Sequence, residues 1–586
     1  MIEQPRDERS RSPYPALVFG TAAAVAAGSV AWAGFFGVGA IPVPGWEGDL
    51  VHTMQQSLDV VGKAARTCFD ALPPDIWRPM GEACAPRTLL SDATMHQVGG
   101  RALAALAAGV AFAWPLSQWR YERTPRRFKA EWVNSKIAKW SEGADAVRNA
   151  NLHMAASAAR TGRGLEIAPK VPLSCEKEAR AFLIVGDPGG GKTIAFWTFI
   201  WQLLRRGSRL VVHDVKGDMV ERWPERFLLL APHDARSLAW DIGRDLVGEI
   251  RVREWAAALI VKSDRSPQWG SGAREILVGL VLSLQHDFGT NWGWGQLKAA
   301  LDLPDAELRE FATRHNPASA RFLALDETGN FTLNAGSYVS TVTAPANEIV
   351  APLARAWGGL APEFRVSLRA WLDDPQPSSP TLILQRAADL PEISKIWIGA
   401  VIDVMTSHLL ASRRDANPAD GVGPQRDTWF VIDEFGQLNL NLKRFMPILE
   451  TGRSLQLRAI FGLQNFSQLG DGAPSSANLA TQLRQLAGVW LAFHLDPGPD
   501  AKIVAEERVT KGKIRVWEND DKTGEKKPAS KEVPILAQED LAELRITRDG
   551  PEGYLLLDNT AFRLQWPFPQ TPKQREGTVK SDRFYE

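Results

Sequence analysis

The chain has 586 residues, 45% of them hydrophobic and 23% charged, which is the composition of a folded protein with several domains and excludes a disordered chain. Lysine plus arginine and aspartate plus glutamate each number 68, so the formal net charge is zero and any nucleic-acid contact must come from a local basic surface. With three cysteines in this length, a disulfide-rich secreted scaffold is excluded as well.

Two uncharged, apolar segments lie near the amino end, at about residues 16–41 and 102–119. About 20 apolar residues are enough for a helix to cross a bilayer, so both segments are predicted to be transmembrane helices. The alternatives are a cleaved signal peptide for the first segment and a buried helix of a soluble domain for the second. The first run is longer than the apolar core of a signal peptide and a second run follows it, which favours a membrane anchor over residues 1–125.

The lysines and arginines around these segments predict their orientation, because such residues collect on the cytoplasmic side of a membrane. Arginines precede the first segment, and a basic cluster at 120–129 follows the second. Both termini are therefore predicted to be cytoplasmic, with the loop of about 46–98 outside. That loop holds Cys68 and Cys84, which we expect to form a disulfide in an oxidising compartment, the alternative being two free thiols. Cys175, on the cytoplasmic side, should stay reduced.

A nucleotide-binding signature follows. AFLIV at 181–185 is typical of a buried strand, and IAFWTFIWQLL after Thr193 is typical of a helix. Between them, GDPGGGKT matches a P-loop in the strand–loop–helix context that this motif requires, the alternative being a chance glycine-rich turn. Lys192 is expected to reach the β- and γ-phosphates of ATP, and the Thr193 hydroxyl to hold Mg²⁺. The predicted nucleotide-binding residues are Gly186, Asp187, Pro188, Gly189, Gly190, Gly191, Lys192 and Thr193.

An acidic pair ends a later strand. TWFVIDEFGQL at 428–438 reads as an apolar strand that ends in Asp433 and Glu434. Together with a P-loop, such a pair predicts Asp433 as a ligand of Mg²⁺ and Glu434 as the general base for the attacking water, whereas alone it could be a solvated strand end. The next strand, LRAIFGLQ at 457–464, ends in Gln464. Gln464 is predicted to sense the γ-phosphate, and its alternative is an ordinary strand cap.

Strand and helix patterns alternate around these motifs, which predicts an α/β fold with a parallel sheet and helices on both faces. Residues 179–242 and 378–570 are predicted to be the two parts of this nucleotide-binding domain, and 126–178 a linker and its start. The segment 243–377 has helical patterns and is too long for a loop, so it is predicted to be a separate all-α domain. The last residues, 571–586, read as a polar tail that we expect to be mobile.

With these motifs in place, the chain resembles the coupling proteins of bacterial conjugation and type IV secretion, the TraD/TrwB/TraG-like class. The resemblance covers nearly the whole chain. Besides the amino-terminal apolar runs and the helical insertion, the segments that carry it are GDPGGGKT, HDVKGDM (213–219), PHDARSLAWD (232–241), VIDEFGQL (431–438) and TGRSLQLRAIFGLQNFSQL (451–469).

The resemblance implies a RecA-like P-loop NTPase motor domain with an inserted all-α domain, preceded by a two-helix transmembrane anchor in the bacterial inner membrane with a periplasmic loop. It also implies a ring-shaped homo-hexamer that hydrolyses ATP with Mg²⁺. Such a ring moves single-stranded DNA and its attached relaxase from the relaxosome to a type IV secretion channel.

Arg453 is a further catalytic candidate. Its segment, KRFMPILETGRSLQLRA, is predicted to be a helix that ends at Thr451-Gly452 and is followed by a strand. The resemblance implies that Arg453 reaches the nucleotide of a neighbouring subunit as an arginine finger, which stabilises charge on the γ-phosphate in the transition state. The alternatives are a surface arginine or a partner of Glu450.

Two questions stay open within these motifs. Arg444 and Arg458 are rivals of Arg453 for the role of the finger. Lys216 and Asp218, in HDVKGDM, receive no role, because a structural turn explains them equally well.

Other functions share parts of the pattern. An FtsK-like chromosomal DNA pump usually has more spans, a long linker and a winged-helix end, which this sequence does not display. A coupling ATPase that delivers protein effectors only would carry the same ATPase residues. A membrane scaffold that binds ATP as a structural ligand need not keep Glu434. An ATPase activity that single-stranded DNA stimulates favours a DNA motor over the last two.

Overall fold

The computed structural model describes residues 131–260, 267–414, 427–438, 442–469, 474–519 and 526–585. The predicted transmembrane segments, the loop between them and the predicted Cys68–Cys84 disulfide lie outside the described residues. Cys175 is a free thiol.

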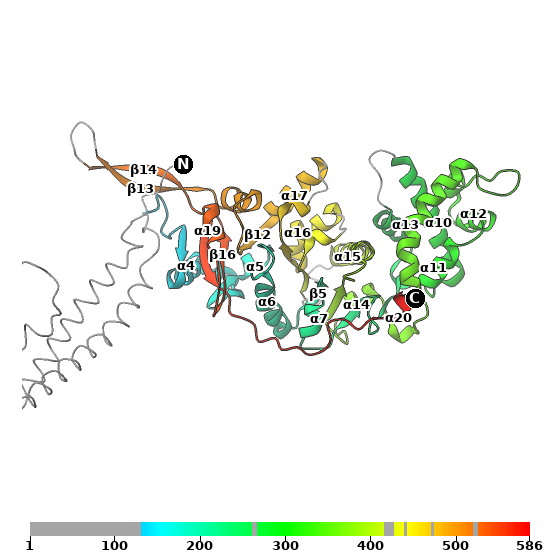
Figure 1. Ribbon diagram of the computed structural model, residues 1–586, viewed down its shortest axis with the longest axis horizontal. Coiled ribbons are helices and arrows are strands. Elements are labelled where there is room, and N and C mark those ends of the chain that lie inside the picture. The colour runs from blue at the N-terminus through cyan, green and yellow to red at the C-terminus, as the bar shows by residue number, and fades with distance from the viewer. Residues whose placement is uncertain are drawn as a thin grey trace, which may run out of the picture. The chain divides into compact units, whose positions relative to one another are not determined.

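An 11-stranded sheet forms the centre of the fold (Figure 1). From β12 to β6 each neighbouring pair of strands is parallel, and the chain order is interrupted because β11 and β10 lie between β4 and β5. In sheet order these strands are β12 (Ala487–Ala492), β4 (Ala181–Val185), β11 (Leu457–Leu463), β10 (Thr428–Ile432), β5 (Arg209–Asp214), β9 (Thr381–Gln385) and β6 (Leu228–Leu230).

Antiparallel strands extend the sheet beyond β12. β16 runs antiparallel to both β12 and β17, and β1 closes this end parallel to β17. These strands are β16 (Gly550–Leu557), β17 (Thr560–Gln565), β1 (Trp140–Glu142) and the short β15 (Ile546–Thr547), which pairs with β16. Away from the sheet are the pairs β2 (Arg163–Ala168) with β3 (Val171–Ser174), β7 (Ala239–Trp240) with β8 (Arg365–Val366), and β13 (Lys511–Asn519) with β14 (Lys526–Pro534).

The parallel strands are apolar throughout because helices cover both faces. Phe182 and Ile184 of β4 belong to one hydrophobic core, whereas Leu183 and Val185 belong to the other. The first core includes α4 (Gly143–Thr161), α6 (Lys192–Arg206) and α7 (Asp218–Arg222), and near it lies α5 (Cys175–Glu178). The second includes α15 (Pro391–Arg414), α16 (Leu442–Leu455), α17 (Pro474–Leu486), α18 (Pro499–Lys502) and α19 (Gln538–Ala542).

Helices fill the segment between β7 and β9, where the sequence predicts an all-α domain. They are α8 (Ile242–Asp245), α9 (Glu249–Leu259), α10 (Pro267–Phe288), α11 (Trp294–Leu301), α12 (Asp305–Arg314), α13 (Leu333–Trp357) and α14 (Leu368–Asp373). A row of buried indoles joins this domain to the large sheet and its helices. Trp240 of β7, Trp294 of α11, Trp357 of α13 and Trp397 of α15 follow one another at centroid distances of 5.6, 5.9 and 5.6 Å.

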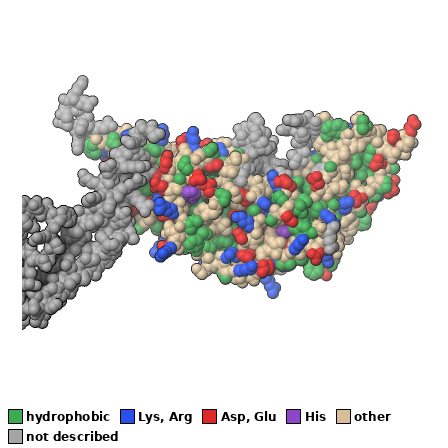
Figure 2. Space-filling model, in the orientation of Figure 1, with side chains coloured by type: hydrophobic (Ala, Val, Ile, Leu, Met, Phe, Trp, Pro, Cys, Tyr) green, Lys and Arg blue, Asp and Glu red, His purple; other side chains and the backbone are tan. Residues whose placement is uncertain are grey.

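One helix of the described residues, α15, is long and apolar enough to cross a membrane, and 72% of its apolar stretch is buried inside the fold. Buried on this scale, α15 serves as a core helix of the domain that contains the large sheet. On the face that Figure 2 shows, acidic and basic side chains of the described residues are interspersed, in keeping with the zero net charge.

The carboxyl-terminal residues 571–585 pack against the rest of the fold, contrary to the prediction of a mobile tail. In Figure 1 they run below α7 and end in α20 (Asp582–Tyr585). The carbonyl of Glu221 accepts the N–H groups of Gln574 and Arg575 at 2.8 and 3.2 Å. Phe584 is 3% exposed within the second hydrophobic core. Backbone hydrogen bonds of this kind leave no signature in a polar sequence, which explains why the prediction was wrong.

Candidate functional site

The P-loop links β4 to α6, and its shape depends on glycine. Gly189 and Gly191 have φ values of +78° and +109°, which other residues rarely adopt. The Gly190 N–H donates a hydrogen bond to the carbonyl of Asp187 at 3.0 Å and closes the turn. A Cβ at Gly191 would lie 2.5 Å from the Cβ of Pro551. The loop leads into the amino terminus of a 15-residue helix, and the amino termini of helices attract phosphate.

Lys192 is held inside the loop. Its side chain is 8% exposed, and Nζ donates to the carbonyls of Gly186 at 2.6 Å and Asp187 at 3.2 Å. Burial lowers the pKa of Lys192, and the negative charges of Glu434 and Asp433 oppose that shift. A buried cation is thus directed at the place where a phosphate chain would lie.

The acidic pair meets the P-loop because parallel strands carry it there. β10 lies two strands from β4, so Asp433 and Glu434 emerge at the same carboxyl edge of the sheet as the P-loop. Glu434 is 5% exposed, and its Oε2 accepts a hydrogen bond of 2.6 Å from Nε2 of Gln464 at the end of the intervening strand β11. Its Oε1 is buried and has no partner among the described residues. Burial raises the pKa of both carboxyls, and Lys192 opposes both shifts.

These residues fit a nucleotide with Mg²⁺. The P-loop supplies N–H groups and a buried lysine, while Thr193 in the first turn of α6 and Asp433 supply the oxygen donors that Mg²⁺ prefers. The unpartnered Oε1 of Glu434 is a free acceptor for a water proton. The geometry therefore unites the site residues predicted within this chain, from Gly186 to Thr193, with Asp433, Glu434 and Gln464.

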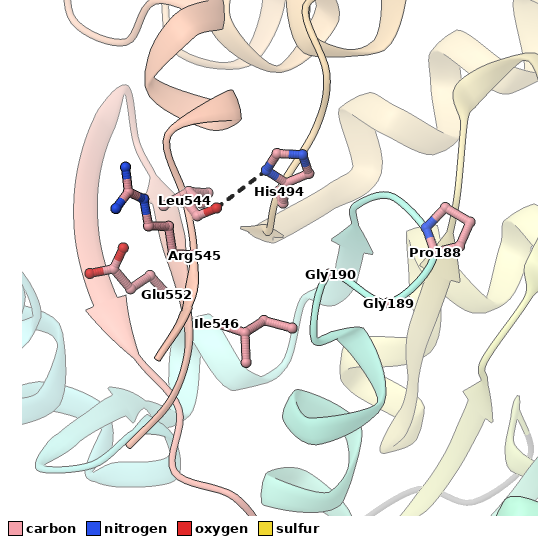
Figure 3. Close-up of a pocket in the computed structure, with 8 residues that line it drawn as sticks. All are labelled: Pro188, Gly189, Gly190, His494, Leu544, Arg545, Ile546 and Glu552. Carbon is pink, nitrogen blue, oxygen red and sulfur yellow. Dashed lines mark hydrogen bonds between the residues drawn. The ribbon is translucent and has the colours of Figure 1, made fainter. Parts of the chain in front are cut away.

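A cavity of about 270 Å³ opens beside the P-loop (Figure 3). His494, just beyond β12, ties it to the P-loop, because its carbonyl accepts the N–H of Asp187 at 2.8 Å. Nδ1 of His494 lies 3.2 Å from the carbonyl of Leu544. The lining residues are Pro188, Gly189, Gly190, His494, Leu544, Arg545, Ile546 and Glu552.

Sequence reasoning missed the lining residues beyond the P-loop. Their one signal is that His494 ends the apolar run VWLAFHL. That signal points to the P-loop only when β12 is known to be the neighbour of β4, and the order of strands in a sheet is not written in the sequence.

Arg453 lies on α16, which continues to Leu455, so the predicted helix end at Thr451-Gly452 is wrong. Gly452 serves close packing, because a Cβ there would lie 2.7 Å from the carbonyl oxygen of Leu457. The helix ends just after, where Gln456 has a φ of +54°. Arg453 is exposed and precedes the start of β11, at the edge of the sheet opposite to its own P-loop.

The rival arginines differ from Arg453. Arg458 lies 3.2 Å from Asp427 and stacks over Trp429 at 5.4 Å from the ring centroid, so it is engaged inside its own subunit. The side chain of Arg444 lies outside the described residues. Of the two described arginines, Arg453 is therefore the exposed one and Arg458 the one held inside the fold.

Comparison with solved structures identifies the fold. TrwBΔN70, a bacterial conjugative coupling protein in a trigonal form with sulphate, matches with a TM-score of 0.60 and 18% identity over 77% of this chain and 100% of that chain. TrwB with the GTP analogue GDPNP matches at 0.57 and 20% identity over 71% and 92%. TrwB with ADP and Mg²⁺ matches at 0.57 and 19% identity over 71% and 91%. The fold is therefore the mixed α/β P-loop motor of TrwB.

No curated protein matches the sequence. A family model described as "Type IV secretion-system coupling protein DNA-binding domain" matches residues 165–526, which is more than half of the chain. The match includes the P-loop, the acidic pair and the helical insertion. The chain therefore belongs to the family of type IV secretion-system coupling proteins.

Proposed function

We propose that this protein is a hexameric ATPase of the bacterial inner membrane that couples a relaxosome to a type IV secretion channel and drives single-stranded DNA through it. The observation that carries the proposal is the pair of buried side chains Lys192 and Glu434 at the P-loop, with the half-buried Gln464 hydrogen-bonded to Glu434. The family match to a DNA-binding domain supports a DNA substrate, and the nucleotides named for TrwB support an NTPase.

The residues divide the chemistry of hydrolysis among them. Thr193 and Asp433 would hold Mg²⁺, which when bound would supply positive charge to offset that of the phosphates. Lys192 binds the same phosphates. Glu434 accepts a proton from the attacking water, for which a carboxyl with a raised pKa is better matched than an ordinary one. Gln464 fixes the orientation of Glu434 through its hydrogen bond and is placed to sense the γ-phosphate.

The cavity beside the P-loop would take the base and ribose. The acidic pair fixes the γ-phosphate end of the nucleotide on the β11 and β10 side of the loop. The other end must then leave on the β12 side, where Pro188 to Gly190 line the cavity together with Ile546 (Figure 3). An apolar side chain beside backbone polar groups is a common setting for a nucleobase.

ATP turnover by the full-length protein in detergent tests the proposal. We expect basal hydrolysis that single-stranded DNA stimulates, and we expect Lys192→Ala to abolish both. Lys298→Ala is the matched control, because Lys298 pairs with Asp302 on the surface of α11. Basal activity without a response to DNA would instead favour a transporter of protein effectors, and a folded hexamer without hydrolysis would favour a scaffold.

A further inference from the structure

The turn at residues 214–218 lies next to the acidic pair. β5 is the direct neighbour of β10, and His213 is in register with Ile432. One residue further along each strand come Asp214 and Asp433, at the same edge of the sheet. The motif HDVKGDM therefore begins at the end of β5 and lies at the catalytic edge of the sheet. None of the roles predicted from the sequence accounts for this motif.

The conformation of this turn is fixed by buried groups. The carboxyl of Asp214 is almost fully buried and accepts three backbone N–H groups, from Gly217 and Val220 at 2.8 Å each and from Lys216 at 3.3 Å. Gly217 has a φ of +84°, which favours glycine. A turn held in this way fixes the backbone of Lys216, whose side chain is exposed.

Lys216 adds a positive charge at this edge of the sheet. It follows Asp214 by two residues, on the turn that leaves β5 beside Asp433, and its side chain is exposed. Two carboxylates, Asp433 and Glu434, face this edge, and a nucleotide would add the charge of its phosphates. A second lysine on the side away from the P-loop is suited to offset that charge.

We propose that Lys216 is a further catalytic residue of the ATPase site, a cation that contacts the terminal phosphate from the β5 side, and that the carboxyl-terminal segment 573–581 positions it. The inference rests on the proposed function. In the reaction a water oxygen bonds to the γ-phosphorus, the bond to the β–γ bridging oxygen breaks, and Glu434 accepts the water proton. Lys216 stabilises the charge on the γ-phosphate oxygens during this step.

The carboxyl-terminal segment braces the turn. The carbonyl of Gly577 accepts a hydrogen bond of 2.7 Å from Nε2 of Gln385, the residue of β9 that is in register with Asp214. A Cβ at Gly577 would lie 2.9 Å from the carbonyl oxygen of Gly217, so the two backbones are in close contact. Any displacement of the segment would therefore move the turn that carries Lys216.

The same segment reaches the all-α domain. The Ser581 N–H donates to the carbonyl of His233 at 2.9 Å, and α20 then packs against α13. The hydroxyl of Tyr585 donates to Asp389 at 3.0 Å. A movement of the all-α domain can thus reach the catalytic edge through this packed segment.

The first test is ATP turnover by the full-length protein in detergent, compared among wild type, Lys216→Met and Lys216→Arg. We expect Lys216→Met to lower kcat about tenfold or more while KM for ATP changes less than about threefold, and Lys216→Arg to recover part of the rate. Lys298→Met is the control. An active wild type with an equally active Lys216→Met overturns the inference, whereas a wild type without turnover overturns the proposed function and this inference with it.

The second test addresses the brace. Gly577→Ala should lower kcat in the same direction as Lys216→Met, and the double variant should be no slower than Lys216→Met alone. Arg583→Ala, at an exposed position of α20, is the control. Thermal unfolding and binding of MgADP show whether Gly577→Ala is folded. If Gly577→Ala is not folded, deletion of 582–585, which leaves Gly577 in place, must reduce the stimulation of ATP turnover by single-stranded DNA. The positioning role of the segment is overturned if the losses in kcat multiply in the double variant, or if the deletion leaves the stimulation unchanged.

Discussion

The hydrogen bond between Gln464 and Glu434 determines how the proposed general base is held. Because Oε2 of Glu434 is occupied by the amide at 2.6 Å, the buried Oε1 is left to receive a proton. We expect Glu434→Gln to bind ATP with near-normal affinity and to hydrolyse it about 10²-fold more slowly or worse, since an amide cannot act as the base. Single-turnover hydrolysis with a parallel binding assay checks this, and fast hydrolysis by this variant would remove Glu434 from its role.

Gln464→Ala tests the orientation of Glu434 separately from its basicity. The change leaves Glu434 in place and removes its hydrogen-bond donor, so we expect kcat to fall less than in Glu434→Gln, by about tenfold, with little change in ATP affinity. Gln437→Ala is a comparison at a half-buried glutamine of the same region. Equal rates for Gln464→Ala and wild type would show that the contact does not matter for turnover.

Asp214 makes stability depend on pH. Burial raises its pKa from 3.8 to about 6, so its contribution to stability is fully present below about pH 4 and is lost as the pH rises through 6. The shift corresponds to about 3 kcal/mol as an order of magnitude. Between pH 4 and pH 7 the free energy of unfolding of wild type should therefore fall relative to Asp214→Asn. Urea unfolding of both proteins, with the exposed Asp582→Asn as a control, measures this difference, and a difference that is constant with pH would contradict it.

At the scale of elements, the P-loop allows two kinds of glycine substitution to be compared. Gly191→Ala brings both a strained φ and a collision with Pro551 of β16, whereas Gly189→Ala brings the strained φ alone, because nothing lies near its Cβ. Strain of this kind costs about 1–2 kcal/mol. We expect a clearly larger loss of nucleotide affinity for Gly191→Ala, measured by titration with MgADP. Gly336→Ala in α13, where the space is open, is the control, and equal losses at the two loop positions would show that Pro551 gives way.

The sequence reveals local structural elements, but it does not reveal contacts between distant parts of the chain. The strand–loop–helix around Lys192 and the strand before Asp433 are local, so period and spacing predicted them, and the parallel sheet brought them together. The helix end after Arg453 was missed because Gly452 serves packing against Leu457. The cavity beyond His494 was missed because it depends on which strand neighbours β4, a contact between residues some three hundred positions apart.

At the scale of the whole molecule, Arg453 would need a neighbouring subunit in order to act as the proposed arginine finger. It is exposed at the sheet edge away from its own P-loop, so only another subunit of a ring could place it beside a γ-phosphate. We expect Arg453→Ala to lower kcat by about 10³-fold with little change in ATP affinity. Mixing it with Lys192→Ala subunits should restore part of the activity, because some interfaces then hold one intact P-loop and one intact finger.

Arg583→Ala mixed with Lys192→Ala is the control for subunit exchange, since Arg583 lies on the exposed side of α20. Wild-type turnover by an assembled ring of Arg453→Ala would show that another residue is the finger. If the mixture of Arg453→Ala and Lys192→Ala shows no ATP turnover while the mixture of Arg583→Ala and Lys192→Ala does, Arg453 acts within its own subunit.

The order of strands in the sheet has a consequence for biosynthesis. β4 and β5 leave the ribosome early, but the strands between them, β10 and β11, begin only at residues 428 and 457. During translation the nascent chain therefore exposes two apolar strands with unpaired edges, which are sites of aggregation until the missing partners arrive. Strand pairs that join residues far apart in the sequence form slowly. A chain of this topology should depend on chaperones while it is made, and products that stop before residue 428 should be insoluble.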